Sequence, residues 1–540
     1  MIVPGSVNPL LLATGGYDVP YSLRFRAANS AYMSRSFGTP TSNIKWTWSG
    51  WIKRGALGTQ IVFNGGDASS NNFFAVQFTA GDLIQIAQIS GGVYNLQMTT
   101  SAVFRDPSAW YHIVIVYDSA NATSTDRVQI YINNSRQTVS YTTGPFGAST
   151  ACQWNVNART HYLRRLDFTA AYGDMYSAEE NFIDGQALTP SSFGRADAAT
   201  GVWVPKKYAG TYGNNGFYLK FADASAATAA AIGKDSSGNG NNWTPSGISV
   251  TSGVTFDQML DTPTLNYAVM NPLDLSGTAA TFQWANMQVT RSGASFAQAY
   301  CSIQMSSGKW YCEMTAGADV ANLSSGIITG TANAAANRYL GQDSFTYGYD
   351  PDGRKVNSGS YAAYGNSWTS GDIIGIIIDA DNGKLYFSKN GTVQNSGDPV
   401  AGTGFAYSGL TGPYRFAVAF ENGGIGDFNF GQRAFSYTPP SGFKALNTQN
   451  IASAAVTTSG SFTGNAAADG PFIWANGNPA TLTINGNAVT FGTHADKTAG
   501  GFKLRTSSAS YNTSGTNNWT ATAGNRFVQS KKPNNAQVNP

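Results

Sequence analysis

Glutamate is a side chain that general acid and base chemistry often uses, and this chain has four in 540 residues: Glu179, Glu180, Glu313 and Glu421. Glu179 and Glu180 are adjacent, and we expect them beside a turn. Because neighbouring residues in extended backbone point to opposite faces, their two carboxylates would not flank a single bond. Aspartates are plentiful, but most stand where turns are expected. The sequence therefore predicts no paired-carboxylate active site.

Histidines and cysteines give no catalytic or metal-binding signature. His112, His161 and His494 are far apart, and no HxxxH or CxxC spacing occurs. The sequence also has no phosphate-binding loop and no GxSxG nucleophile elbow. His112 lies in a strongly hydrophobic stretch, which is typical of a core histidine. These observations predict a protein that is not an enzyme and has no cofactor.

Three cysteines cannot form a disulfide framework. Cys301 and Cys312 flank a predicted turn, which leaves a pairing across a hairpin open. We favour the alternative for these two and for Cys152, namely buried free thiols in a protein assembled in a reducing cytoplasm. The N-terminus lacks the basic start of a secretory signal, and no apolar run is long enough to span a membrane.

Two aspartate-rich loops raise the question of structural calcium. In the first, Asp379 to Gly383, the glycine falls one place early and Asn390 stands where a calcium loop has its glutamate, so a hairpin turn is favoured. The second loop begins at Asp235 and offers many side-chain oxygens. Asp235 is a weak metal candidate beside the simpler interpretation of a turn.

Composition indicates an all-β chain. Charged residues make up 12% of the sequence, against about 25% in ordinary globular proteins. Aspartate, which prefers turns, far outnumbers glutamate, which prefers helices. The net charge is +3 without a basic cluster, so a nucleic-acid partner is not expected. The length predicts two to four domains.

The N-terminal half has the pattern of a β-sandwich. After a proline- and glycine-rich arm (residues 1–20), the strongest strand pair is WYHIVIVYD at 110–118 and RVQIYINN at 127–134. With the SGWIK opening at 49–53, this pair resembles the laminin-G or concanavalin-A-like family over residues 21–223. Asn134 stands where the family usually has glycine, and asparagine also tolerates a left-handed backbone. The resemblance implies a jelly-roll sandwich related to lectins and to some glucanases.

A second sandwich is indicated by the stretch from 368 to 392. Five isoleucines between 373 and 378 form a β-branched run, and an alternating strand follows Asn382-Gly383, which predicts a hairpin with a two-residue turn. Asn390-Gly391 predicts the next corner. Further motifs are GKWYCE at 308–313, YGYDPDGRK at 347–355, YRFAVAF at 414–420 and FNFG at 428–431. Together they resemble a SPRY domain over residues 279–446, which implies a recognition sandwich.

The glucanase alternative is disfavoured by the residues themselves. Retaining hydrolases on the first fold carry two glutamates on one strand with an aspartate between them, and no Glu-x-Asp-x-Glu pattern occurs here. Residues 224–278 are predicted to be an extended linker. Residues 451–540 are predicted to form a small β-rich module with an Asn485-Gly486 hairpin, too short in its strands for an independent core without partners.

The order of these segments resembles virion proteins of tailed bacteriophages. The resemblance implies a tail fibre or spike protein, assembled in the host cytoplasm, that binds a host-surface glycan or receptor. Its partners would be other virion proteins and further copies of itself, with a trimer as one form, and it would not be embedded in a membrane. Aromatic rings would stack on sugars, aspartates and asparagines would bond hydroxyls, and an oligomer would add avidity.

The predicted ligand-binding loops span 64–72 on the first sandwich and 349–364, together with Trp368, on the second. For every aromatic residue among them, core packing is the favoured role and ligand contact the alternative. A structural head fibre, capsid decoration or tail adaptor protein is the main alternative function, and a polysaccharide-degrading enzyme is a weaker one. The candidate residues are Asn64, Asp67, Asn71, Tyr349, Asp350, Asp352, Tyr361, Tyr364 and Trp368.

Overall fold

The computed structural model describes residues 16–198, 201–276, 280–330 and 337–451, together with the backbone of strands between 459 and 530. The described residues from 16 to 451, apart from 197–201, belong to one compact unit, and the C-terminal strands belong to a second. The described regular structure is β-sheet, antiparallel except for the pairing of β33 with β23, with short 3-10 turns, which confirms the predicted fold class. These turns are η2 (Ala27–Asn29), η3 (Ser124–Asp126), η4 (Pro190–Ser192) and η5 (Val320–Asn322).

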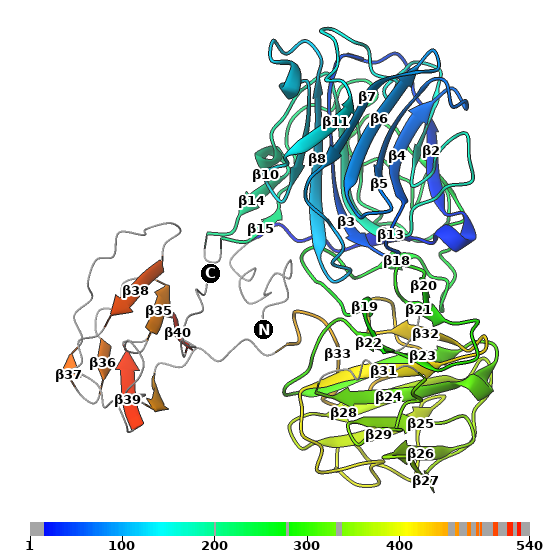
Figure 1. Ribbon diagram of the computed structural model, residues 1–540, viewed down its shortest axis with the longest axis vertical. Coiled ribbons are helices and arrows are strands. Elements are labelled where there is room, and N and C mark those ends of the chain that lie inside the picture. Colours follow the sequence, from blue (N-terminus) through cyan, green and yellow to red (C-terminus); the bar gives the residue numbers. More distant parts are fainter. Residues whose placement is uncertain are drawn as a thin grey trace. The chain divides into compact units, whose positions relative to one another are not determined.

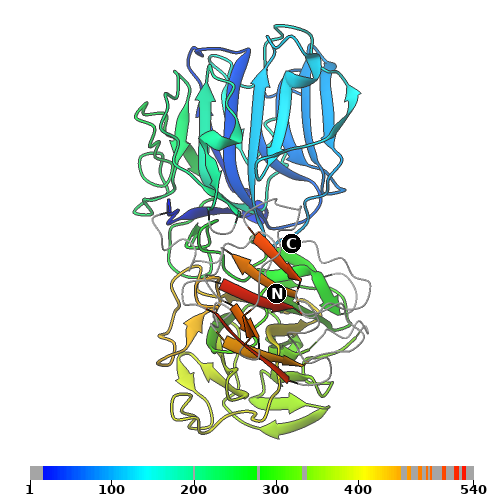
Figure 2. The same cartoon turned by 90° about the vertical axis from the view of Figure 1, so that its left-hand side faces the viewer.

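Two sheets make the first sandwich, whose long strands run side by side in Figures 1 and 2. One sheet has the order β10-β9-β8-β3-β13-β1-β18, with β16 beside β13. Its strands are β1 (Ser22–Phe25), β3 (Lys45–Arg54), β8 (Trp110–Asp118), β9 (Val128–Ile132), β10 (Ser135–Arg136), β13 (Met175–Asp184), β16 (Phe217–Leu219) and β18 (Gln258–Met259).

The facing sheet has the order β11-β7-β6-β5-β4-β12-β2-β17. A separate hairpin joins β14 (Gly194–Ala196) to β15 (Trp203–Pro205). The strands of the facing sheet are β2 (Tyr32–Ser36), β4 (Gln60–Gly66), β5 (Phe73–Phe78), β6 (Ile84–Ser90), β7 (Val93–Thr100), β11 (Val139–Thr143), β12 (Thr160–Leu163) and β17 (Thr244–Ser246).

The predicted strand pair of the N-terminal half is β8 with β9. Ile113 and Ile115 of β8 lie in the core between the sheets, where Trp46 of β3 stacks on Tyr117 at 5.3 Å. The turn after β9 uses Asn133 and Asn134, with φ of 47° and 71°. Asparagine therefore takes the left-handed conformation at Asn134, as the sequence predicts.

The second sandwich also consists of two sheets. The first has the order β19-β22-β31-β24-β25-β26-β27, and the second has the order β20-β21-β32-β23-β28-β29-β30, with β33 parallel to β23. Their bounds are β19 (Met270–Ser276), β20 (Thr281–Gln283), β21 (Gln288–Thr290), β22 (Ala297–Cys301), β23 (Lys309–Ala316), β24 (Leu323–Thr329), β25 (Thr346–Tyr349), β26 (Arg354–Asn357), β27 (Ser360–Ala363), β28 (Ile373–Asp379), β29 (Lys384–Lys389), β30 (Thr392–Val393), β31 (Tyr414–Phe420), β32 (Ile425–Asn429) and β33 (Lys444–Ala445).

The isoleucine run is β28, and it is apolar on both faces because both faces are covered. Ile374, Ile376 and Ile378 lie in the large core cluster. Ile377 points the other way, into a smaller cluster with Tyr311 and other aromatic residues. A strand buried on both sides reads as a continuous apolar run.

The turn that follows β28 differs from the prediction. Asp379 pairs with Lys384, so the connection has four residues and not two, and within it only Gly383 has a positive φ, of 58°. The Asp379 carboxylate accepts hydrogen bonds from the backbone N–H and side-chain amide of Asn382, at 3.1 and 2.9 Å. A two-residue Asn-Gly turn would need a left-handed backbone at both residues. Here the hydrogen bonds of the Asp379 carboxylate shape the turn instead. The two-residue turn occurs at Asn390-Gly391, with φ of 46° and 80°.

Residues 224–278, predicted as an extended linker, are packed into both sandwiches. They supply β17 and β18 to the first sandwich and β19 to the second. Lys53 of β3 donates to the Asp261 carboxylate and the Asn266 amide oxygen, both at 2.7 Å, and to the Tyr267 carbonyl at 2.8 Å. The Trp110 indole N–H also donates to Asp261, at 3.0 Å.

Further buried contacts tie the same region together. The Asp257 carboxylate accepts from Arg24 and Arg26 of the first sandwich. The Asp174 carboxylate accepts the backbone N–H groups of Trp284 and Ala285, which belong to the second. From the predicted N-terminal arm, Val19 is buried and its N–H donates to Thr264 at 3.1 Å. The junction between the sandwiches is therefore continuous core, not a flexible connection.

The C-terminal unit contains two sheets among the strands described. Their orders are β34-β39-β36-β37 and β38-β35-β40. The Asn485-Gly486 turn lies outside the described residues, but the two strands that flank it, β36 and β37, pair with each other. The strands are β34 (Ser459–Thr463), β35 (Phe472–Asn476), β36 (Leu482–Ile484), β37 (Asn487–Ala488), β38 (Gly501–Arg505), β39 (Thr516–Ala521) and β40 (Arg526–Ser530).

Candidate functional site

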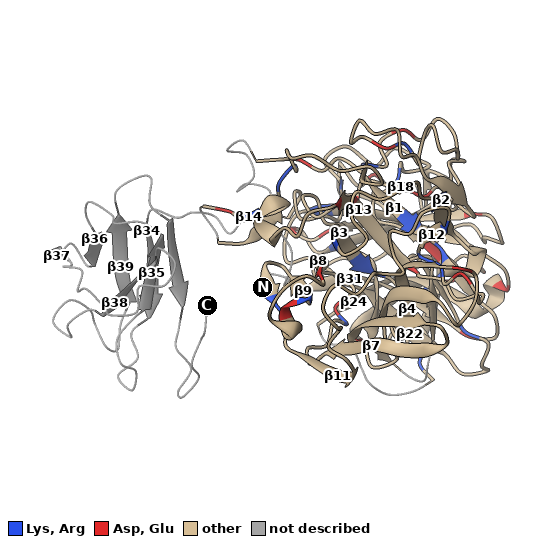
Figure 3. Ribbon diagram, turned by 90° about the horizontal axis from the view of Figure 1, so that it is seen from above, with Lys and Arg blue, Asp and Glu red and all other residues tan. Residues whose placement is uncertain are grey.

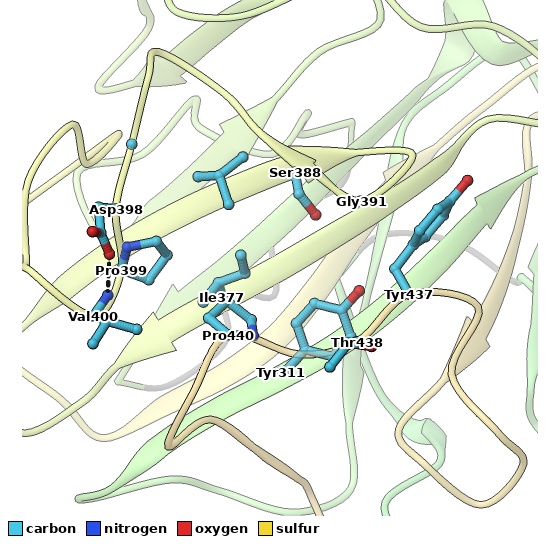
Figure 4. Close-up of a pocket in the computed structure, with 12 residues that line it drawn as sticks. Tyr311, Ile377, Ser388, Gly391, Asp398, Pro399, Val400, Tyr437, Thr438 and Pro440 are labelled. Carbon is cyan, nitrogen blue, oxygen red and sulfur yellow. Dashed lines mark hydrogen bonds between the residues drawn. The ribbon is translucent and has the colours of Figure 1, made fainter.

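A hollow of about 390 Å³ lies on the outer side of the second sandwich (Figure 4). Strands β23, β28 and β29 form its floor, and two loop segments, 397–400 and 437–440, form its walls. Its volume is within the range of about 300–1,000 Å³ that is usual for ligand pockets. The lining residues are Tyr311, Ile377, Ser388, Gly391, Val393, Gly397, Asp398, Pro399, Val400, Tyr437, Thr438 and Pro440.

The floor follows from strand alternation. Tyr311 of β23 pairs with Ile377 of β28, and Ser388 of β29 pairs with Gly375. Cross-strand partners share a face, so these side chains meet on the outer surface of the sheet. A side chain at Gly375 would lie 2.2 Å from the Ser388 Oγ atom, so glycine there leaves room for Ser388.

One wall is fixed to this floor by Glu313 of β23. Its carboxylate accepts the backbone N–H groups of Ser436 and Tyr437, both at 2.9 Å, and the hydroxyl of Tyr311 at 3.1 Å. Burial raises the pKa of Tyr311, and the neighbouring Glu313 charge raises it further. The Tyr311 hydroxyl therefore remains a protonated donor at neutral pH, and the wall keeps its position before any ligand enters.

The opposite wall is held by Asp398. One of its carboxylate oxygens accepts the N–H group of Val400 at 2.8 Å (Figure 4) and that of Ala401 at 3.0 Å. Val400 is 56% exposed and presents an apolar side chain at the rim. Gly391 lies where a Cβ atom would come within 2.5 Å of the Tyr437 ring. The left-handed turn at Asn390-Gly391 thus leaves room for the Tyr437 ring.

The lining combines apolar walls with hydroxyl groups. Pro399, Pro440 and the half-buried ring of Tyr437 face a floor that carries the hydroxyl of Ser388. Among these twelve lining residues, Asp398 is the one carboxylate and there is no lysine, arginine or histidine. Such a pocket disfavours an anionic ligand, because nothing in it would pair with a charge of −1. One oxygen of Asp398 is already taken by two N–H groups of its own loop, so a neutral ligand with both apolar and hydroxyl surface suits the lining best.

Three of the predicted ligand-binding aromatics are core residues of the second sandwich. Tyr349, Tyr364 and Trp368 are at most 7% exposed. The Tyr349 ring lies 5.8 Å from that of Tyr364 and 6.3 Å from that of Trp368. Core packing, the role favoured from the sequence, is what these contacts show, and a ligand could not reach the rings without repacking.

Asp350, Asp352 and Tyr361 form a separate surface group. Tyr361 is 40% exposed, and the Arg354 guanidinium lies 4.4 Å from its ring centroid. Arg354 also pairs with Asp352. Burial, followed by the nearby Asp352 charge, raises the pKa of Asp350 to about 7. The structure brings these residues together at a place where a ligand could touch them, so they remain predicted contacts.

The predicted residues of the first sandwich divide in the same way. Asn64 is fully buried, and its side chain donates to the Phe74 carbonyl at 3.1 Å and accepts the Asp167 N–H at 3.0 Å. Asp67 and Asn71 are exposed in the loop after β4. The Asp67 carboxylate accepts from Ser69 and Asn72, which shapes the loop.

Asp235 has its carboxylate filled by the chain itself. One oxygen accepts the N–H groups of Tyr218 and Ser237, and the other accepts the Ser237 hydroxyl and the Asn241 N–H, all at 2.7 to 2.9 Å. Within the described residues, no group of three or more histidine, cysteine, aspartate or glutamate side chains could hold a metal ion. These contacts are those of a turn.

The remaining titratable candidates are also part of the fold. Glu179 and Glu180 lie within β13 at a bulge, not beside a turn. Glu179 accepts from Tyr17 and Tyr218 at 2.9 and 2.7 Å, whereas Glu180 pairs with Arg164. Their different partners leave no shared site for a substrate.

His112 contacts a serine, an arrangement that invites comparison with a catalytic dyad. Its Nε2 atom lies 2.8 Å from the Ser49 hydroxyl, and its Nδ1 atom accepts the Trp203 indole N–H at 2.9 Å. Because Nδ1 accepts, the proton of the neutral ring is on Nε2, which therefore donates to Ser49 and cannot take its proton. Burial lowers the pKa of His112 to about 3, so the ring stays neutral.

The overall charge distribution and the cysteines indicate no further site in the described chain. In Figure 3 the acidic and basic positions of the described chain are scattered, without a broad region of one sign. Cys152, Cys301 and Cys312 are buried and unpaired. In the described residues no helix is both long and apolar enough to cross a membrane.

Sequence reasoning missed the pocket. Two segments that form the pocket have recognisable sequence patterns, namely Asn390-Gly391 and the SPRY-like strand at 308–313. Both patterns indicate the fold, and neither indicates a pocket. The wall at 437–440 depends on Glu313, which is more than 120 residues away. Only the folded structure brings them together.

Fold and site define a chain with two β-sandwiches of the type used for binding. Residues 28–180 match the concanavalin A-like lectin/glucanases superfamily, and residues 309–433 match the SPRY domain. The chain therefore contains a laminin-G-like and a SPRY domain, as the sequence motifs predict.

The curated relatives share short segments with this chain. The ATP-dependent RNA helicase DDX1 of Xenopus laevis is 30% identical over 118 residues, which cover 22% of this chain and 15% of that protein. The E3 ubiquitin-protein ligase RKP of Arabidopsis thaliana is 33% identical over 165 residues, which cover 29% of this chain and 12% of that protein. The chain thus spans less than a fifth of the length of these relatives.

Two solved structures are also similar. The SPRY domain of human HERC1 has 15% sequence identity and a TM-score of 0.25, with 31% of this chain and 99% of that chain covered. The pentraxin of Limulus polyphemus has 15% identity and a TM-score of 0.23, with 32% and 80% covered.

Proposed function

We propose that this chain is a non-enzymatic binding protein whose second sandwich holds a neutral, hydroxyl-bearing ligand in the pocket between 397–400 and 437–440. The observation that carries the proposal is the fixed geometry of the pocket, in which Glu313 orients both the floor and one wall. A terminal sugar of a host-surface glycan has the required chemistry. Its ring would pack on Tyr437 and its hydroxyls would bond Ser388 and Asp398.

We place this binding activity on the virion of a tailed bacteriophage, in a tail fibre or spike assembled in the host cytoplasm. The support for this setting is the resemblance carried by the order of the two sandwiches, the segment that follows Asp235 and the C-terminal module. In that setting the chain would form a homo-oligomer beside other virion proteins. Repeated sites would raise the effective affinity of a weak pocket.

A glycan-array screen of the purified chain, with analysis of released products, tests the proposal. We expect selective binding without cleavage. Tyr437→Ala should lower the affinity for the glycan roughly tenfold. Tyr94→Ala, which removes an exposed tyrosine of the first sandwich, should leave the affinity unchanged. Equal binding by both variants would contradict the pocket assignment.

The same experiment separates the alternatives. Release of saccharide fragments would support a polysaccharide-degrading enzyme. Absence of glycan binding, together with tight association with other virion proteins, would support a head fibre, capsid decoration or tail adaptor. Immunogold labelling of intact particles would test the proposed location directly.

A further inference from the structure

Three tyrosines surround one arginine on the outer face of the first sandwich. Tyr32 lies on β2 and Tyr162 on β12. Arg165 lies just after β12 and Tyr172 just before β13, and these two residues form an isolated β-bridge. We call these four residues the tyrosine-arginine cluster. All four are half-buried, so part of each side chain faces solvent.

The guanidinium of Arg165 is held against aromatic rings. It lies 4.8 Å from the ring centroid of Tyr32 and 4.9 Å from that of Tyr162. Tyr32 and Tyr162 meet edge to face at 5.9 Å, and Tyr172 stacks on Tyr32 at 6.2 Å. Cation–π contact with two rings fixes the direction of the guanidinium without neutralising its charge.

This arginine has no partner for its charge among the described residues. Its Nε atom is buried without a hydrogen bond, and no ion pair involves it. The neighbouring Arg164 differs, because it pairs with Glu180 in the core. The nearest acidic residue along the chain, Asp167, accepts the Ala68 N–H with one oxygen and makes no ion pair with Arg165.

Hydroxyl groups border the guanidinium on the same face. The hydroxyls of Tyr32, Tyr162 and Tyr172 have no hydrogen-bond partner in the described part of the chain. Ser34 lies opposite Tyr162 on the neighbouring strand, and Thr244 lies opposite Ser34, so both share the face of the cluster. A group of rings and hydroxyls with one preoriented cation suits a sugar that bears an anionic group.

We propose that the tyrosine-arginine cluster is a binding site for an acidic saccharide, with the carboxylate or sulfate of one sugar on Arg165 and its ring on the tyrosines. A planar guanidinium binds such groups through two parallel hydrogen bonds. The polar, hydroxyl-rich border favours a saccharide over an acidic peptide, which would need further cations for its repeated charges. This site belongs to the first sandwich and does not depend on the pocket of the second.

Isothermal titration of the full chain with tetragalacturonic acid tests this site. We expect binding that weakens as salt is raised, and a dissociation constant roughly tenfold higher for Arg165→Gln. Arg165→Lys keeps the charge but loses the planar guanidinium that can make two parallel hydrogen bonds, so it should retain part of the affinity. Arg136→Gln is the matched control, since it removes a surface arginine of the same sandwich that is already paired with Asp126.

Four comparisons make the result decisive. Maltotetraose, a neutral probe, should bind no better to the wild type than to Arg165→Gln, and a sulfated tetrasaccharide distinguishes a sulfate from a carboxylate preference. Tyr32→Phe keeps the ring and should bind a few-fold more weakly, which guards against a folding defect in the arginine variants. Tyr437→Ala should leave tetragalacturonate binding unchanged even if the proposed pocket proves wrong.

Several results would overturn the proposal. One is equal affinity of the wild type and Arg165→Gln for tetragalacturonate. Another is that the wild type does not bind tetragalacturonate at any concentration reached. A third is tight binding of hexaglutamate without binding of the acidic saccharides, which would make the cluster a peptide site.

Discussion

Replacement of Lys53 by methionine should destabilise the protein by about 3 to 5 kcal/mol, the usual effect of removing one partner of a buried ion pair. Lys53 and Asp261 are both fully buried with 2.7 Å between their charged atoms. In Lys53→Met the Asp261 carboxylate would keep the Trp110 N–H but lose its counter-charge. Methionine has nearly the same length, so little of the loss would come from packing.

A double-mutant cycle gives the decisive measurement. Urea unfolding followed by the fluorescence of the chain's twelve tryptophans would give the free energy of unfolding of each variant. In Lys53→Met/Asp261→Asn no charge remains buried, so we expect at least half of the lost free energy of unfolding to return. If Lys53→Met is within about 1 kcal/mol of the wild type, or if the double variant loses the sum of the single losses, the reasoning fails.

The pH dependence of Lys53→Met provides a second check. Burial raises the pKa of Asp261 above its ordinary value, and without Lys53 nothing equally strong opposes that effect. A raised carboxyl pKa contributes stability below the unfolded value, and that stability is lost as pH rises through the folded value. The deficit of Lys53→Met should therefore shrink as the pH falls toward 4.

Three further predictions concern other parts of the chain. Burial raises the pKa of Asp174 to about 6, so the free energy of unfolding should fall as pH rises from 4 to 7, by up to roughly 3 kcal/mol, and Asp174→Asn should flatten this slope in urea titrations. Gly391→Ala should cost about 1 to 2 kcal/mol and weaken glycan binding, because its Cβ would meet Tyr437 at 2.5 Å; unchanged binding would contradict the proposed wall. Asp235→Ala should lower the melting temperature, whereas chelation of calcium should not, and a shift on chelation would reopen the metal interpretation.

Local patterns predicted much of the fold because they depend on near neighbours. The isoleucine run of β28 and the pairing of β8 with β9 followed from side-chain periodicity. The four-residue turn after β28 did not, since the Asp379 carboxylate shapes it in place of a second left-handed residue. A dipeptide such as Asn-Gly permits a tight turn but does not require one.

The sites were harder to predict because they depend on residues far apart in sequence. An aromatic residue looks the same in a strand whether it is buried, as Tyr349 is, or exposed, as Tyr361 is. The segment 224–278 has little periodicity, yet Asp257 and Asp261 within it make buried ion pairs with the first sandwich. Such contacts leave no periodic signal, because they are set by the packing of one domain on another.

The buried junction has a consequence for how the two sandwiches act together. Because Lys53 and Asp174 tie the first sandwich to residues at the base of the second, the tyrosine-arginine cluster and the pocket are held at a constant separation. A ligand that carries both features at that separation would engage the second site without the entropic loss that a flexible tether imposes. The chain would then discriminate between polysaccharides by the spacing between their acidic and neutral sugars as well as by the identity of those sugars.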